Sequence, residues 1–363
     1  MSIVNIFFNS IGRKFRNFVF RKRLGRKKMS AKLIFFMMSF FDKFEIYSNT
    51  GKVGNFDHYV PKLLLRNFKI SKSGSDCNSV YCWIKRSNYI TKKSIDKICG
   101  EVDYDTSNAK GVPSDYISRR LFAELLEQKA SHVLKIINTN DGLDLTFLEE
   151  STLAVFMAHQ ITRVPAFRQL LLDFFSLGYS KGLIDYEDFG DKETLRQKVA
   201  KNEVKITYDQ IAEGNFSKRI DGGKPQLIMM SLIIASDMAK KIYKGNLHIL
   251  EIPQGSKEEF VISDNPVIIL DFERKEILRF CPWWDIEKKN IWIFMPISPR
   301  KAVFYCKSKK KDGPIEKENE DLVRLFNFGQ YFCSYGGVFS KNKNIIRSHL
   351  NKYMPELNRL TRS

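Results

Sequence analysis

Residues 259–270 read EFVISDNPVIIL, and they indicate that this chain contains a buried sheet. Two strand patterns, Glu259–Ser263 and Val267–Leu270, flank a polar segment whose Asp, Asn and Pro are typical turn formers. Similar apolar runs occur nearby, at His248–Ile252, Ile291–Met295 and Ala302–Cys306. Residues 246–306 are therefore predicted to be rich in strands.

The rest of the chain places strands and helices in separate blocks. Residues 56–110 have strand patterns, such as the alternating run Val80–Ile84, whereas residues 114–244 are dominated by helical patterns. The last block, 314–352, is mixed. There we expect a helix at 316–330, a strand at 331–338 and a terminal helix near 342–352.

This segregation predicts an α+β fold rather than a doubly wound parallel sheet. We expect a mixed or antiparallel sheet with a central helical segment, folded as a single large domain over residues 50–363. The chain has 363 residues, of which 43% are hydrophobic, so it can bury a core of that size.

The N-terminal extension, residues 1–49, has a different composition. Residues 1–41 carry ten basic side chains and no acidic one, within a chain of net charge +19. One apolar stripe at helical spacing predicts a basic amphipathic helix that lies on a membrane surface: Val4, Phe8, Ile11, Phe15 and Phe18.

Three interpretations of this extension remain open. It contacts an anionic membrane, it binds nucleic acid, or translation starts later, at Met29, Met37 or Met38, and the extension is uninformative. The apolar run Leu33–Phe41 is too short to span a bilayer, and no secretory cleavage pattern follows it. We therefore predict a cytoplasmic protein with peripheral membrane contact.

The six cysteines predict a reducing compartment. No Cys-x-x-Cys pair occurs, and several cysteines lie inside apolar runs. Buried free thiols fit this pattern better than a zinc site or a disulfide framework.

His58 is the first candidate site residue. It precedes Pro61, which suits the first turn of a short helix, so His58 is expected just before a helix N-terminus. There it acts as a base, a metal ligand or an anion contact. The alternative is a local hydrogen bond at the helix entry.

A second candidate lies near the end of the helix predicted at 148–164, which follows a capping box formed by Thr146 and Glu149. Gln160 falls on its apolar face, Arg163 is three residues further on, and Pro165 should end or kink the helix. A buried amide must find partners, so this end forms either a pocket rim or a structural tie to a sheet edge.

The third candidate is the pair Asp264 and Asn265, on the loop between the two strands quoted first. A carboxylate at the end of a strand suits catalysis or metal binding, although Asp and Asn before Pro are also ordinary turn formers. Other carboxylates complete the candidates, with solvated surface charge as the alternative for each: Glu101, Asp103, Asp105, Glu124 and Glu127.

The motifs for nucleotide hydrolysis by a P-loop, for dinucleotide binding, for zinc proteolysis and for α/β-hydrolase chemistry are absent from the sequence. The sequence therefore gives little support to these four classes of function.

His58-Tyr59-Val60-Pro61 with Leu65-Arg66-Asn67-Phe68 resembles the opening motif of the family catalogued as domain of unknown function 4238. Further matching pieces follow in order over roughly residues 56–345: Val80–Trp83, Glu101-x-Asp103-Tyr104, Glu127 (or Glu124), Gln160-x-x-Arg163-x-Pro165, Ser263–Val267, Pro296–Pro299 and Asn327.

The resemblance does not define a reaction, because the family's name states that its function is not established. It implies that six polar residues converge on one site: His58, Glu101, Gln160, Arg163, Asp264 and Asn327. It also adds Asn67, Tyr104 and Asn265 as candidate binding residues.

Two hypotheses follow. The first is a metal-assisted hydrolase acting on nucleic acid or another phosphate-bearing substrate. Glu127 or Glu101 would hold a divalent ion such as Mg²⁺ or Mn²⁺ together with Asp264, His58 would act as base or ligand, and Arg163 would stabilise phosphate charge. The second is a non-catalytic ligand-binding or interaction module, attached to an anionic membrane through the N-terminal helix.

Overall fold

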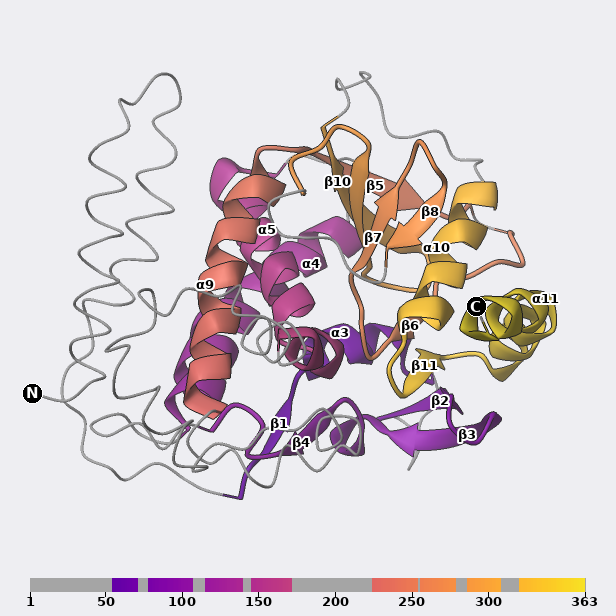
Figure 1. The fold of residues 1–363 in the computed structure, drawn as a ribbon, viewed down its shortest axis with the longest axis horizontal. Coiled ribbons are helices and arrows are strands. Elements are labelled where there is room, and N and C mark those ends of the chain that lie inside the picture. Colours follow the sequence, from indigo (N-terminus) through magenta and orange to yellow (C-terminus); the bar gives the residue numbers. More distant parts are fainter. Residues whose placement is uncertain are drawn as a thin grey trace, which may run out of the picture. The chain divides into compact units, whose positions relative to one another are not determined.

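The computed structural model describes residues 54–70, 78–106, 115–139, 145–171, 224–253, 255–278, 286–307 and 320–362 (Figure 1). The chain divides into two compact units. The first comprises Gly54–Asp105, Ile117–Phe167 and Met230–Ser363, and it contains most of the described residues. The second comprises Met1–Val53, Thr106–Tyr116 and Arg168–Met229. The sheets below belong to the first unit.

The larger sheet has five antiparallel strands in the order β5-β10-β9-β7-β8. Strand β10, which pairs with both β5 and β9, is buried at every position, and the run Ala302–Cys306 is apolar throughout rather than alternating. The members of this sheet are β5 (Asn246–Glu251), β7 (Ile268–Asp271), β8 (Glu276–Leu278), β9 (Ile291–Pro296) and β10 (Lys301–Cys306).

A second sheet has four antiparallel strands in the order β3-β2-β11-β6, so a strand from near the C-terminus pairs between two earlier ones. Its register brings Phe339 opposite both Cys82 and Ile262. The small strands β1 (Phe56–His58) and β4 (Gly100–Val102) form a separate ribbon. The four-stranded sheet consists of β2 (Ser79–Ile84), β3 (Tyr89–Ser94), β6 (Ile262–Ser263) and β11 (Gly337–Ser340).

The helices are mostly grouped in the middle of the chain and at its end. The α-helices are α3 (Lys62–Leu65), α4 (Gln128–Thr139), α5 (Phe147–Thr162), α9 (Lys224–Tyr243), α10 (Glu320–Cys333) and α11 (Lys343–Arg362). A π-helix, η3 (Tyr116–Glu127), leads into α4, and the short 3₁₀ turns are η1 (Arg66–Phe68) and η2 (Ile95–Lys97).

Helix α10 contacts both sheets, since it touches β7 of the larger sheet and β6 and β11 of the smaller one. Phe326 stacks on Phe294 of β9 with ring centroids 3.7 Å apart. Gly329 permits the close approach, because a Cβ at this position would lie 2.8 Å from the Cγ2 of Ile268. Positions 327 and 330 of the same helix carry amides that hold the chain before β7, as described below.

The structure confirms the α+β fold with antiparallel sheets, and the capping box of Thr146 and Glu149 is present at the start of α5. The predicted strand 331–338 is wrong except for its last two residues, because β11 begins at Gly337. Helix α10 continues to Cys333 because Tyr331 packs as a fully buried helical residue against Trp83, with ring centroids 5.5 Å apart. The terminal helix also runs beyond the predicted 352, to Arg362, with Pro355 on its exposed side.

Candidate functional site

The guanidinium of Arg163, just after α5, forms the centre of a buried ion cluster. Its Nε donates to Oδ2 of Asp105 at 2.8 Å, and its terminal nitrogen donates to Oε1 of Glu127 at 2.9 Å. The guanidinium carbon also lies 3.9 Å from the ring centre of Phe122. Arg163 is thus held by two charges and an aromatic face, a geometry that suits arginine rather than lysine.

Hydrogen bonds link this cluster to the N-terminal ribbon. The hydroxyl of Tyr104 donates to the backbone carbonyl of Arg163 at 2.8 Å. The carboxylate of Asp57 accepts the backbone N–H of Asp105 at 3.0 Å. Segments that are distant in the sequence are therefore tied together at the end of α5. This helix ends at Thr162, as the position of Pro165 predicted.

Burial dominates the electrostatics of the cluster. It raises the pKa of Glu127, and Arg163 opposes that rise. Burial also raises the pKa of Asp57. On the neighbouring turn, burial and then the charge of Arg163 lower the pKa of His159 to about 3, so His159 is neutral at physiological pH.

Three polar atoms on the last turns of α5 have no hydrogen-bond partner among the described residues: Nδ1 of His159, Oε1 of Gln160 and Oγ1 of Thr162. All three side chains are buried. Gln160 is therefore buried, as its place on the apolar face predicted. His159 packs edge-on against Phe122, with ring centroids 5.5 Å apart.

His58 lies on β1 and is only half-buried. Its Nε2 lies 3.0 Å from the carbonyl oxygen of Ile95, so this nitrogen donates to the carbonyl. Burial lowers the pKa of His58. Glu101 is exposed on the paired strand β4, opposite Asp57. The bond of His58 joins residues that are 37 apart in the chain, so it is not the local bond at the helix entry that the alternative described.

Asp264 follows β6 and forms a second hydrogen-bond network. Its Oδ1 accepts the backbone N–H of Tyr335 at 2.8 Å, and its Oδ2 accepts the N–H groups of Gly336 and, at 3.2 Å, Gly337. Burial raises the pKa of Asp264 to about 6, against the opposing effect of these N–H groups. The carboxylate therefore holds the turn between α10 and β11. Its neighbour Asn265 donates to the carbonyl of Cys333 at 3.4 Å.

Further motif amides connect distant backbone segments. Asn327 of α10 donates to the carbonyl of Glu259 at 2.9 Å and accepts the N–H of Val261 at 3.1 Å. Asn67 donates to the carbonyl of Ile297 at 2.8 Å. Each amide satisfies buried backbone groups that a nearby strand does not reach.

The sequence interpretation missed Gln330, which accepts from the backbone N–H of Ser263 at 2.9 Å and donates to the carbonyl of Pro266 at 3.0 Å. Its spacing of three from Asn327 on a helical pattern was the available signal. Asp57 was also missed, although it directly precedes His58.

The predicted metal ligands, Glu127 and Asp264, are engaged in different networks, with Arg163 and with the turn after α10 respectively. Among the described residues, no group of three or more His, Cys, Asp or Glu side chains is arranged to hold a metal ion. The metal site therefore stays a prediction, and the described residues show no ligand cluster that supports it. The motif residues form at least two hydrogen-bond networks, around Arg163 and around Asp264, and Tyr59 packs on Tyr104 with ring centroids 5.3 Å apart. The convergence of six motif residues on one site stays a prediction.

The predictions about the extension, residues 1–49, lie outside the described residues. Within the described ranges, no helix is both long and apolar enough to cross a membrane. The prediction of buried free thiols is confirmed for Cys82, Cys99 and Cys306.

The motifs, their order and this fold define a family of α+β proteins. Residues 57–344 match the family described as "Protein of unknown function (DUF4238)", so the chain belongs to this family, and the resemblance predicted from the sequence is confirmed. The match ends in the first turn of α11. No curated protein and no solved structure matches the chain.

Proposed function

We propose that this protein is a binding module for a polyanionic ligand, and that its family motifs build the scaffold of the module rather than a catalytic centre. The observation that carries the second part, the scaffold role of the motifs, is the engagement of Asp264. Its two oxygens accept three backbone N–H groups of residues 335–337. A carboxylate committed in this way is poorly placed to bind a metal or to accept a proton from substrate.

The Arg163 cluster supports the same interpretation. A phosphate-stabilising arginine must turn its guanidinium toward the substrate. Here the guanidinium is bound by Asp105 and Glu127, and its side chain is 4% exposed. The motif side chains thus neutralise one another or satisfy backbone groups, as scaffold residues do.

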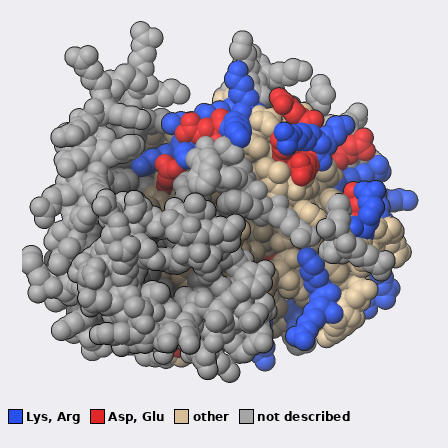
Figure 2. All heavy atoms as spheres, in the orientation of Figure 1, with Lys and Arg blue, Asp and Glu red and all other residues tan. Residues whose placement is uncertain are grey.

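Charge indicates the class of ligand. The ten basic residues at positions 1–41 account for only part of the net charge of +19, so the rest of the chain is also basic. In Figure 2, the lower part of the described face, where β2 and β3 lie in this orientation, shows Lys and Arg with few acidic groups, while the upper part mixes both signs. Such a distribution favours nucleic acid or an anionic membrane surface.

The test uses the full chain with a labelled single-stranded oligonucleotide and, separately, with vesicles that contain phosphatidylserine. We expect binding to at least one, and an affinity that falls steeply between about 50 and 200 mM salt. Absence of binding to both at the lowest salt would overturn the proposal.

A calorimetric titration of Mn²⁺ into the same protein tests the hydrolase hypothesis directly. Stoichiometric Mn²⁺ binding that disappears in Asp264→Asn, together with phosphodiester cleavage, would replace the binding module with the metal-assisted hydrolase. No heat of Mn²⁺ binding to a folded protein is the result expected here.

A further inference from the structure

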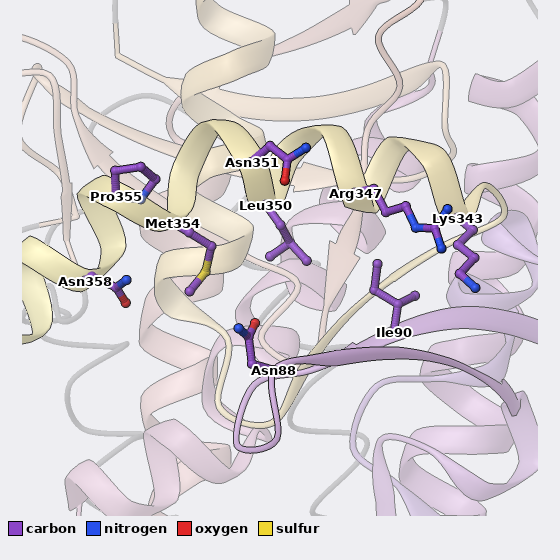
Figure 3. Close-up of a pocket in the computed structure, with 9 residues that line it drawn as sticks. All are labelled: Asn88, Ile90, Lys343, Arg347, Leu350, Asn351, Met354, Pro355 and Asn358. Carbon is purple, nitrogen blue, oxygen red and sulfur yellow. The ribbon is translucent and has the colours of Figure 1, made fainter.

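A groove of about 560 Å³ lies between the β2–β3 hairpin and α11 (Figure 3). Two residues of the hairpin, Asn88 and Ile90, form one side. The other side is one face of α11, with lining residues at helical spacing: Lys343, Arg347, Leu350, Asn351, Met354, Pro355 and Asn358. None of these nine residues is acidic.

The groove follows from the amphipathic character of α11. One stripe of the helix packs on the core of the four-stranded sheet, where Ile346 and Tyr353 contact a cluster that includes Trp83 and Val338. The adjacent stripe is left to border the groove. Leu350 and Met354 point from α11 toward the hairpin, so the floor is apolar and partly buried while the rim is polar (Figure 3).

The two cations of the groove are uncompensated. Within the described part of the chain, neither Lys343 nor Arg347 has an ion-pair partner. Other basic residues of the same unit do, such as Lys244, which binds Glu287 at 3.0 Å. A site that lacks carboxylates and presents two unpaired cations has a positive potential that an anionic ligand would neutralise.

Their position on the helix adds to this potential. Lys343 and Arg347 lie within the first five residues of α11, which has no acidic residue in its first turn. The helix macrodipole places partial positive charge at this end, so cations here are disfavoured for helix stability. Their presence is therefore better explained by a ligand than by the folding of α11.

The amides give the groove hydrogen-bonding capacity beyond charge. The Oδ1 of Asn88 accepts from Nε1 of Trp83 at 2.9 Å, which directs the amide nitrogen of Asn88 toward the groove. Asn351 is exposed on the rim, one turn after Arg347. Amide groups can both donate and accept, as recognition of base edges requires.

We propose that this groove binds a single strand of nucleic acid, an inference that rests on the polyanion-binding function proposed above. Backbone phosphates would contact Lys343 and Arg347, bases would lie on Leu350, Met354 and Ile90, and their edges would reach Asn88 and Asn351. A strand with its bases turned inward fits an apolar floor between polar rims. A flat bilayer fits less well, because the apolar side chains are recessed in the groove instead of projecting from a convex surface.

The experiment compares two double variants of the full chain that change the net charge equally. Lys343→Glu with Arg347→Glu alters the groove. Lys135→Glu with Lys289→Glu is the control, at two exposed positions of α4 and of the turn before β9. Binding of a labelled oligothymidylate is followed by fluorescence anisotropy over a series of salt concentrations, and circular dichroism verifies that each variant is folded.

We expect the groove variant to bind at least about tenfold more weakly than the control, and the slope of log affinity against log salt to fall by about 1.4, for two lost phosphate contacts on a single strand. Equal affinities of the two variants would overturn the groove while leaving polyanion binding by the rest of the chain intact. If the wild type binds neither the oligothymidylate nor the phosphatidylserine vesicles, the proposed function fails instead.

Two additions keep the result unambiguous. If the charge-reversed groove variant does not fold, Lys343→Gln with Arg347→Gln removes the same contacts with less perturbation, and the same loss is expected. Asn351→Ala should weaken binding without changing the salt slope, because it removes a contact to a base and not to a phosphate.

Groove-dependent binding to phosphatidylserine vesicles but not to the oligonucleotide would replace nucleic acid with a membrane ligand.

Discussion

The Nε of Arg163 lies 2.8 Å from Oδ2 of Asp105, and the two side chains are 4% and 0% exposed. Asp105 follows the ribbon of β1 and β4, whereas Arg163 ends α5. Glu127, at the end of η3, binds the same guanidinium at 2.9 Å. One cation thus connects three parts of the fold, and its loss leaves two carboxylates without compensation.

Arg163→Met should therefore lower the free energy of unfolding by about 3–5 kcal/mol, because breaking one side of a buried pair leaves uncompensated charge. Urea denaturation at pH 7 measures the change. Arg120→Met is the matched control, since Arg120 pairs with Glu124 at an exposed helical position and should cost less than about 0.5 kcal/mol. Equal losses in the two variants would show that the cluster does not stabilise the fold.

Asp264→Ala removes the acceptor of three backbone N–H groups at the turn between α10 and β11. We expect a loss of about 1–3 kcal/mol, because the buried N–H of Gly337 loses its acceptor, whereas water can reach the N–H groups of the exposed residues Tyr335 and Gly336. Asp321→Ala, at a side chain that is 91% exposed, provides the control and should change stability little. A folded Asp264→Ala protein of wild-type stability would mean that the aspartate has a role other than stabilising the turn between α10 and β11.

The sequence was sufficient for the strands β2, β5, β7, β9 and β10 and for most helix positions, since these depend on local periodicity. It also singled out Arg163 and Asp264 as buried or loop-end polar groups with unusual neighbours. The partners of these residues were not predictable, because they lie 36 to 73 residues away in the chain. Pairing over such separations is decided by how the elements pack.

The groove could not be predicted from the sequence either. The positions Lys343, Arg347, Asn351 and Asn358 are separated by multiples of roughly one helical turn, but their face is defined only when α11 packs through Ile346 and Tyr353. Strand β8 and the continuation of α10 to Cys333 were likewise set by tertiary contacts. Intrinsic strand and helix preferences of residues predict structure poorly where tertiary packing determines it.

His159 predicts a pH dependence of stability. Its pKa is lowered to about 3 in the folded protein from an ordinary value of 6.5, mainly by burial. Between these values the unfolded chain binds the additional proton, so stability from this residue is present above pH 6.5 and is lost as the pH falls toward 3. At pH 5 the loss amounts to about 2 kcal/mol.

His159→Phe should remove this dependence, since a phenyl ring can keep the edge-on contact with Phe122 and does not titrate. Thermal or urea unfolding of the wild type and the variant at pH 7 and pH 5 gives the comparison. The difference between the two proteins should move in favour of the variant as the pH falls. If it stays constant, His159 does not carry the acid sensitivity.

Gly329→Ala tests the packing of α10 on the larger sheet. Alanine favours a helix over glycine by about 1 kcal/mol, so intrinsic preference alone predicts stabilisation. The new Cβ would lie 2.8 Å from Cγ2 of Ile268, and the helix or the strand must shift to accommodate it. We expect overpacking to dominate and stability to fall by about 1–3 kcal/mol in urea denaturation. Ser348→Ala, at an exposed position of α11, should instead be neutral or stabilising. A stabilised Gly329→Ala protein would show that α10 is not held against β7 as closely as the contact of Gly329 with Ile268 requires.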